Sequence, residues 1–428
     1  MLNEKKSISF WLISLALLTF LFLIQSFYPK YIDQLYSQKS FAVLNHLTLS
    51  HDEHSLEYYR GKINDLLIGP VYSFITGVIF FLFAFVYLRG AKGWHIGIAV
   101  FVYLFLTRRN ILTFPPYGDA LVGPFSDAIW LLRHQFNYPA YWQVDSFLTG
   151  GPQVYPTSIY PGFLAVLMKV APSAKVFLII MHLLSFAMAA GVIALFRAVL
   201  QRIMDQDLAL IGSFLLLSHP LFQSMSELIN MEMPSVLFAL LAIFALINQR
   251  MYWACCMAFI SLMIKGPGAI ACLCVFLGSV ILYFAQSKGE RKWLPMVVSG
   301  ILCVFVLIKM KVRNAIIGGN VSHNNISFLS GWYLVKDKLY FWIFLLIALG
   351  LCLRLGYVYW KREKGMRQIF MDYFTPGMMV LTAGLWFLVH ANFSALIYRY
   401  ELLLLPFLLF TFIYIFYLVF NNSGFLKG

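Results

Sequence analysis

The chain has 428 residues and a net charge of +14, and 61% of its residues are hydrophobic against 12% charged. The mean hydropathy is +0.78, and apolar runs long enough to cross a bilayer recur along the sequence. We predict an all-α polytopic membrane protein, because a backbone in lipid must satisfy its own hydrogen bonds. Outside the helix ends there is no basic stretch with interleaved aromatic residues, so a nucleic-acid partner is excluded.

About twelve segments are apolar enough to span the membrane. The predicted spans are residues 8–28, 69–89, 94–110, 173–197, 206–221, 235–249, 250–264, 267–286, 293–309, 339–357, 374–390 and 400–420. The first resembles a signal peptide but is long and lacks a small-residue cleavage site, so we predict an uncleaved helix. Residues 158–171 are interpreted as a helix on the membrane surface, because a span there would reverse the side of every later basic loop.

The basic loops set the orientation, because Lys and Arg accumulate on the cytoplasmic side. With both termini cytoplasmic, alternate loops are basic, for example residues 89–93, 197–202, 287–292 and 361–367. The other loops are then extracytoplasmic, at 29–68, 111–172, 222–234, 265–267, 310–338 and 391–399. We divide the chain into the N-terminal helices with loop 29–68 (1–110), a large loop with amphipathic interfacial helices (111–172) and a transmembrane bundle (173–428).

The stretch PPYGDALVGPFSDAIW, residues 115–130, holds two carboxylates in a chain where they are scarce. Asp119 lies at the start of a helix-like run, where it either caps the helix or serves as a general base at the lipid interface. Asp127 follows about two helical turns later, on roughly the same face. It is interpreted either as a solvated loop residue or as a supporting acid.

Aromatic and acidic residues gather in two further outer loops. Residues 137–163 are rich in Tyr, Trp, Pro and Gly, and Trp142 and Tyr155 suit either packing at the membrane surface or stacking on a sugar ring. Glu227 and Glu232 lie between two apolar helices. Acids beside the hydrocarbon edge are costly unless paired or used, so these two belong either to a solvated turn or to a site.

Several outer cations depart from the charge rule. Lys265 in MIKGPGAI is either a lysine that snorkels to the interface or a phosphate ligand. Lys309, Lys311 and Arg313 either anchor headgroups or bind a lipid phosphate. Arg399 is either structural or offers bidentate contact to phosphate.

Four motifs in this order resemble the GT-C membrane glycosyltransferases, above all the branch of protein mannosyltransferases and lipid A aminoarabinose transferases. They are GDA (118–120), the interfacial YPTSIYPGF (155–163), SLMIKGPGA (261–269) and YRYELLLLP (398–406). The resemblance covers residues 110–415. The chain departs from it in two ways, with three predicted spans before the acidic loop instead of one, and GD in place of the DE or DD of many members.

The resemblance implies a GT-C-like fold and an inverting glycosyltransferase in a bacterial inner or plasma membrane. A polyprenyl-phosphate-linked sugar would be the donor, and a glycan, lipid or protein hydroxyl on the extracytoplasmic side the acceptor. Asp119 would be the general base, while Lys265 and Arg399 would hold the leaving phosphate. No cofactor is expected, and a divalent cation is left open. The rival interpretations are a flippase or transporter of lipid-linked glycans, a scaffold of a glycan-assembly complex, and a polysaccharide polymerase or ligase.

Overall fold

The structure, a computed structural model, describes residues 76–113, 115–116, 121–141, 157–286, 292–316, 345, 348–350, 366–390 and 401–422. Across these residues the regular structure is helical and no strand occurs, which confirms the predicted all-α class for this part of the chain. The predicted span 8–28, the loop 29–68 and most of the span 339–357 lie outside the described residues.

The chain forms two compact units. The first comprises Met1–Ala91 and Leu217–Gln223, and its described part includes an apolar helix, Thr76–Tyr87. The second comprises Lys92–Leu216 and Ser224–Gly428 and holds most of the described helices. All of the contacts discussed below lie within this second unit.

Helices occupy most of the predicted spans. They are α3 (Gly93–Arg108), α7 (Ala174–Leu200), α8 (Gln206–Ser218), α10 (Glu232–Ile247), α11 (Met251–Ile264), α12 (Ala269–Ala285), α13 (Leu294–Ile316), α17 (Phe374–His390) and α18 (Glu401–Asn422). By length and composition, Ala174–Leu200 and Gly266–Ala285 can cross a membrane, and Gln206–Ser218 with Leu221–Glu227 adds a third if this bent pair is one span. The total of about twelve spans stays a prediction, because the apolar stretches of the other helices among the described residues are only 10–17 residues long, for example Leu294–Lys309 within α13.

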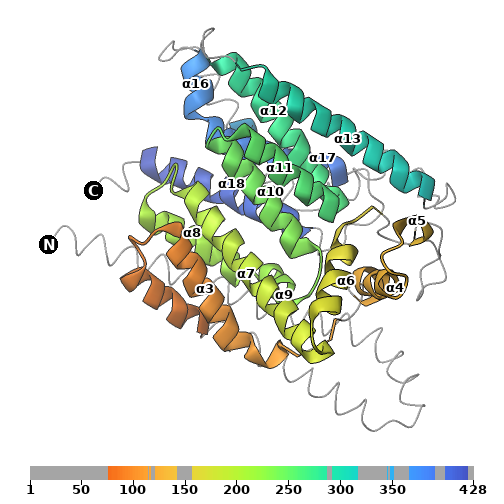
Figure 1. The fold of residues 1–428 in the computed structure, drawn as a ribbon. Coiled ribbons are helices and arrows are strands. Elements are labelled where there is room, and N and C mark those ends of the chain that lie inside the picture. The colour runs from red at the N-terminus through yellow and green to blue at the C-terminus, as the bar shows by residue number, and fades with distance from the viewer. Residues whose placement is uncertain are drawn as a thin grey trace, which may run out of the picture. The chain divides into compact units, whose positions relative to one another are not determined.

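Four consecutive helices, α10 to α13, lie side by side in Figure 1, and α10 also contacts α7, α17 and α18. The connections are short, which makes successive helices antiparallel neighbours. Gln249 turns the chain between α10 and α11 with a φ of 58°, and Lys265 with the 3-10 turn η3 (Gly266–Gly268) joins α11 to α12.

Side-chain contacts tie the loops together at each end of these helices. At one end, Arg202 after α7 donates to Asn248 in the α10–α11 turn. At the other end, the Lys309 amine of α13 donates to the carbonyl of Leu262 in the last turn of α11. The end that holds Arg202 is the one predicted to face the cytoplasm.

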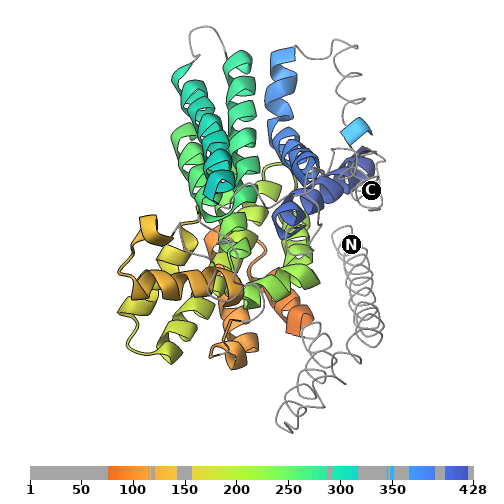
Figure 2. The ribbon, with the colours of Figure 1, turned by 90° about the vertical axis from the view of Figure 1, so that its right-hand side faces the viewer.

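A smaller layer of helices lies at the second of these ends, as the orange and yellow ribbons of Figure 2 show. It consists of α4 (Ser126–Arg133), the short α5 (Tyr138–Tyr141) and α6 (Tyr160–Val170). A π-helical turn, Leu121–Phe125, leads into α4. With 11 residues, α6 is about 16 Å long, which is too short for a hydrocarbon core of about 30 Å. This length favours the predicted position of α6 on the membrane surface.

The turn between α11 and α12 requires a glycine. A Cβ at Gly268 would overlap the main-chain carbonyl of Ser261 and the amide nitrogen of Leu262, which cannot rotate away. We expect Gly268→Ala to lower the free energy of unfolding by about 1–3 kcal/mol, measured by unfolding in mixed detergent micelles. Gly266→Ala is the matched control, because nothing lies within 4 Å of a Cβ built there. Equal losses in both variants would contradict this explanation.

Candidate functional site

Three segments far apart in the sequence meet at the end of α10–α13 that carries the smaller layer. They are the start of α6 with the residues before it (157–160), the loop before α10 (228–231) and the turn after α11 (264–268). Each falls within, or next to, a loop that the sequence places on the extracytoplasmic side. The fold therefore collects at one place the segments that carry several of the predicted site residues.

Hydrogen bonds fix the start of α6 against the end of α11. The amide of Ile159 donates to the carbonyl of Met263 at 3.0 Å, and Ser158 Oγ donates to the carbonyl of Ile264 at 2.6 Å. Ser158 Oγ also lies 3.6 Å from the sulfur of Met231. These bonds satisfy carbonyls that the last turn of α11 leaves without a helical partner, so the contact is specific and closes this end of the helix.

An ion pair between Glu232 and Lys265 lies at this meeting point. The Lys265 amine donates to Oε1 of Glu232, and the two residues are only 7% and 5% exposed. Glu232 is the first residue of α10 and Lys265 directly follows the last residue of α11. Each charge is therefore favoured by the dipole of its own helix. Burial of two charges is tolerated when they are paired this closely.

Two interpretations from the sequence are wrong here. Lys265 is not a snorkelling lysine, and Glu232 is not part of a solvated turn, because both side chains are buried and paired with each other. Burial and the neighbouring Glu232 carboxylate raise the pKa of Tyr160, the first residue of α6. Tyr160 is thus a further polar group beside the ion pair.

Asp127 is buried in the first turn of α4, so its interpretation as a solvated loop residue is wrong. The helix contacts α6, and Ala128 and Leu131 of α4 belong to the same buried cluster as Leu164 of α6. Burial raises the pKa of Asp127 to about 7, and the nearby Tyr141 hydroxyl offsets part of this rise. Within the described part of the chain, neither Oδ2 of Asp127 nor the Tyr141 hydroxyl oxygen has a hydrogen-bond partner. The Tyr141 hydroxyl therefore lies near the carboxyl without a fully formed hydrogen bond to it.

Glu227 forms a second ion pair, with Arg108. Glu227 ends α9 (Pro220–Glu227), Arg108 ends α3, and their side chains are 33% and 13% exposed. Glu227 is therefore paired and partly solvated. Arg108 was not among the predicted site residues, although a basic residue at the outer end of a predicted span departs from the charge rule in the same way as Lys265 does.

The basic cluster of Lys309, Lys311 and Arg313 lies on the last turns of α13, whereas the predicted span ended at residue 309 and left Lys311 and Arg313 in the following loop. Lys309 donates to the Leu262 carbonyl and so closes the end of α11. Lys311 is exposed, and it remains available to an anion. Cations in the last turn of a helix are stabilised by its dipole, which explains why the helix continues through them.

Four predicted site residues lie outside the described residues: Asp119, Trp142, Tyr155 and Arg399. Their neighbours in sequence are described. Helical structure begins two residues after Asp119, with the π-helical turn Leu121–Phe125, and the predicted role of Asp119 at a helix start stays a prediction. In sequence, Trp142 directly follows α5, Tyr155 lies five residues before α6, and Arg399 lies two residues before α18.

The sequence analysis did not single out Ser158, Tyr160 or Tyr141. A signal was present for the first two, because Pro161 in the first turn of a helix marks its start and a serine just before it is a common cap. Ser158 lies one position before the N-cap residue Ile159, and its Oγ accepts from the amide of Tyr160 at 3.2 Å. No sequence signal distinguishes Tyr141 among 24 tyrosines.

In the part of the chain that the structure describes, no group of three or more His, Cys, Asp or Glu side chains is arranged to hold a metal ion. Comparison with protein-family models, with curated proteins and with solved structures finds no match to the chain.

Proposed function

We propose that the chain is a membrane glycosyltransferase of the GT-C kind, which moves a sugar from a polyprenyl phosphate to an acceptor hydroxyl on the extracytoplasmic side. The observation that carries this proposal is the buried Glu232–Lys265 pair, set where residues 157–160, 228–231 and 264–268 meet. Three loops from the same predicted side contribute to this one polar feature. Burial of a charged group at the edge of an apolar bundle is costly, so such a group is expected to belong to a functional site.

Asp119 is proposed as the general base. Its carboxylate takes the proton of the acceptor hydroxyl, whose oxygen attacks the anomeric carbon and inverts its configuration. The bond to the lipid phosphate breaks, and the phosphate leaves with its electron pair. Asp119 lies two residues before the helical run that leads into α4, and a carboxylate near the start of a helix is stabilised by the free backbone amides there.

The leaving phosphate needs positive charge, because charge-assisted contacts stabilise the negative charge that develops on it. Lys265 and Arg399 are proposed for this role, with Lys311 and Arg313 as secondary contacts. Lys309 is less suited, because its amine already closes α11. In this proposal the Glu232 carboxylate holds Lys265 in place until the phosphate shares its amine.

The position of the charges distinguishes this proposal from a transporter of lipid-linked glycans. Transporters place ionisable groups and interrupted helices near the middle of the membrane. Both ion pairs described above lie at helix ends, with Glu232 at the start of α10 and Glu227 at the end of α9. A polysaccharide polymerase or ligase would use the same donors, and it differs only in the acceptor.

The proposal is tested with purified protein in detergent and a panel of polyprenyl-phosphate sugars, with release of polyprenyl phosphate as the readout. We expect release from one donor class, dependent on an added acceptor. A nucleotide sugar serves as the control donor and should not react. Lipid transport across vesicles without release from any donor would favour the transporter instead.

A further inference from the structure

The Ser158 hydroxyl links the three segments that meet at the candidate site. Ser158 lies in the segment before α6, and its Oγ donates to the carbonyl of Ile264 at 2.6 Å and lies 3.6 Å from the sulfur of Met231. Ile264 directly precedes Lys265 in the chain, at the end of α11. Met231 directly precedes Glu232, at the start of α10. One buried hydroxyl therefore contacts the residue before each partner of the ion pair.

The bond to Ile264 fixes the peptide group that leads into Lys265. A peptide group is planar, so its carbonyl and its amide turn together. The carbonyl, from Ile264, accepts from Ser158 Oγ, and the amide, from Lys265, donates to the carbonyl of Ser261 at 3.0 Å. The backbone of Lys265 is extended, with a φ of −147° and a ψ of 144°. Loss of the Ser158 bond would thus leave one side of this peptide unsupported, at the point where the chain leaves the helix.

The same hydroxyl orders the start of α6 next to Glu232. Ser158 Oγ accepts from the amide of Tyr160 at 3.2 Å while it donates to Ile264, as a hydroxyl with one hydrogen and two lone pairs allows. Burial, and then the Glu232 carboxylate, raises the pKa of Tyr160, so the two side chains lie close together. The hydroxyl is therefore tied to the surroundings of both charges.

We propose that Ser158 is a positioning residue, whose hydroxyl sets the main chain at Lys265 and so holds the amine between Glu232 and the donor phosphate. A buried ion pair is favourable only when its geometry is good. A cation stabilises a leaving phosphate only when it lies where the negative charge develops. The part that concerns the phosphate rests on the proposed function, whereas the effect on the ion pair is independent of it.

The test adds Ser158→Ala to the wild type and to the double variant Lys265→Met/Glu232→Gln, which lacks both buried charges. Unfolding in mixed detergent micelles and the affinity for polyprenyl phosphate are measured for each protein. Because a positioning residue acts through the ion pair, Ser158→Ala should raise the unfolding equilibrium constant at least about fivefold more in the wild type than in the double variant. It should also weaken the affinity about fivefold in the wild type, and not in the double variant.

A first control removes a buried hydroxyl that does not bond next to the ion pair. Ser185 of α7 donates to the carbonyls of Ser226 at 2.8 Å and Leu228 at 3.2 Å. Like Ser158, Ser185 is a buried serine bonded to main-chain carbonyls. Ser185→Ala should therefore lower the stability by the same amount in the wild type and in the double variant.

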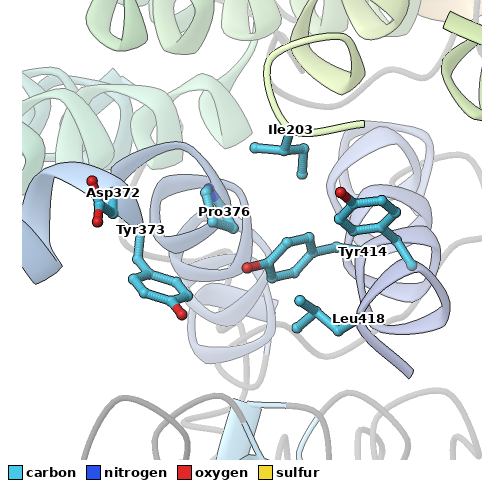
Figure 3. Close-up of a pocket in the computed structure, with 7 residues that line it drawn as sticks. Ile203, Asp372, Tyr373, Pro376, Tyr414 and Leu418 are labelled. Atoms are coloured by element: carbon cyan, nitrogen blue, oxygen red, sulfur yellow. The ribbon is translucent and has the colours of Figure 1, made fainter. Parts of the chain in front are cut away.

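A second control lies at the other end of the bundle. Tyr373, directly before α17, lines an open pocket of about 410 Å³ together with Ile203 (Figure 3). Ile203 directly follows Arg202, whose side chain donates to Asn248 just beyond the last residue of α10. Glu232 is the first residue of this 16-residue helix, so the two ends are about 24 Å apart along its axis. Tyr373→Phe removes a hydroxyl there and should affect both backgrounds equally.

Equal losses of stability after Ser158→Ala in the two backgrounds would overturn the proposal, because Ser158 would then only close the ends of α6 and α11. The proposal also fails if the affinity falls equally in both, because Ser158 would then act without Lys265. If the wild type binds no polyprenyl phosphate, the proposed function fails, and the comparison of stabilities still decides the role of Ser158. Ser158→Cys, whose thiol is a weaker donor, gives the same comparison with a smaller loss if Ser158→Ala does not fold.

Discussion

Lys265→Met is expected to lower the free energy of unfolding by about 3–5 kcal/mol. The substitution keeps most of the side-chain volume and removes the buried cation that compensates the Glu232 carboxylate. A charge that stays buried after its partner is removed carries its full desolvation cost. The measurement is unfolding of the purified protein in mixed detergent micelles at pH 7.

The double variant Lys265→Met/Glu232→Gln should recover most of this loss, because both buried charges are then gone. Arg108→Met is the matched control, since it breaks an ion pair that is partly solvated, and we expect it to cost at most about 1 kcal/mol. A loss for Lys265→Met no larger than that of Arg108→Met would show that the pair is not a buried one.

The same double variant separates the two roles given to Lys265. Because it is expected to fold nearly as stably as the wild type, a fall in donor affinity reports on the amine itself and not on unfolding. We expect at least a tenfold weaker affinity for polyprenyl phosphate, since a charge-assisted contact to phosphate is worth about 1.5–3 kcal/mol. Unchanged affinity in the folded double variant would leave Lys265 with a structural role only.

Asp127→Asn is expected to stabilise the protein above neutral pH. The pKa of Asp127 is about 7 in the folded protein, against an ordinary value of 3.8. The folded chain therefore binds more protons than the unfolded chain between these values, and its stability falls as the pH rises through this window. At about 1.4 kcal/mol per pH unit, the loss reaches about 4 kcal/mol at and above pH 7.

The variant should match the wild type near pH 4 and exceed it by a few kcal/mol at pH 8, in unfolding measured across this range. Asp205→Asn is the matched control, because its carboxylate is exposed at the start of α8, and it should leave the pH dependence unchanged. If wild-type stability instead rises with pH and Asp127→Asn abolishes that rise, then the carboxylate is ionised and paired in the folded protein.

Much of the helical layout is readable from the sequence, because each apolar run must form its own helix in lipid. Residues 250–264 and 267–286 show this well, since α11 and α12 begin and end within a few residues of those bounds. The end of α13 was predicted too early, at residue 309. Hydropathy drops at Lys309, whereas the helix continues to Ile316, where cations suit its last turns.

The sequence pointed to Glu232 and Lys265 as notable residues, but it did not predict their environment in the fold. Glu232 and Lys265 were chosen because charges are rare beside apolar runs, and the structure brings these two together. Their burial was not predicted, because it is a property of the packed helices, in which the two partners meet although they are 33 positions apart in the sequence. Asp127 is a similar case, since its burial follows from the tertiary packing of α4, and no pattern in the sequence distinguishes it from a solvated loop residue.

The most direct test of the proposed function is the single-turnover rate of sugar transfer from the reactive donor, compared between wild type and Asp119→Asn. Asp205→Asn, which removes a carboxylate at the predicted cytoplasmic end, is the control. We expect Asp119→Asn to bind the donor and to fold as the wild type does, with a rate about 10²–10⁴-fold lower because the general base is lost. A rate equal to that of the wild type would contradict the assignment of Asp119 as the base and, with it, the proposed mechanism.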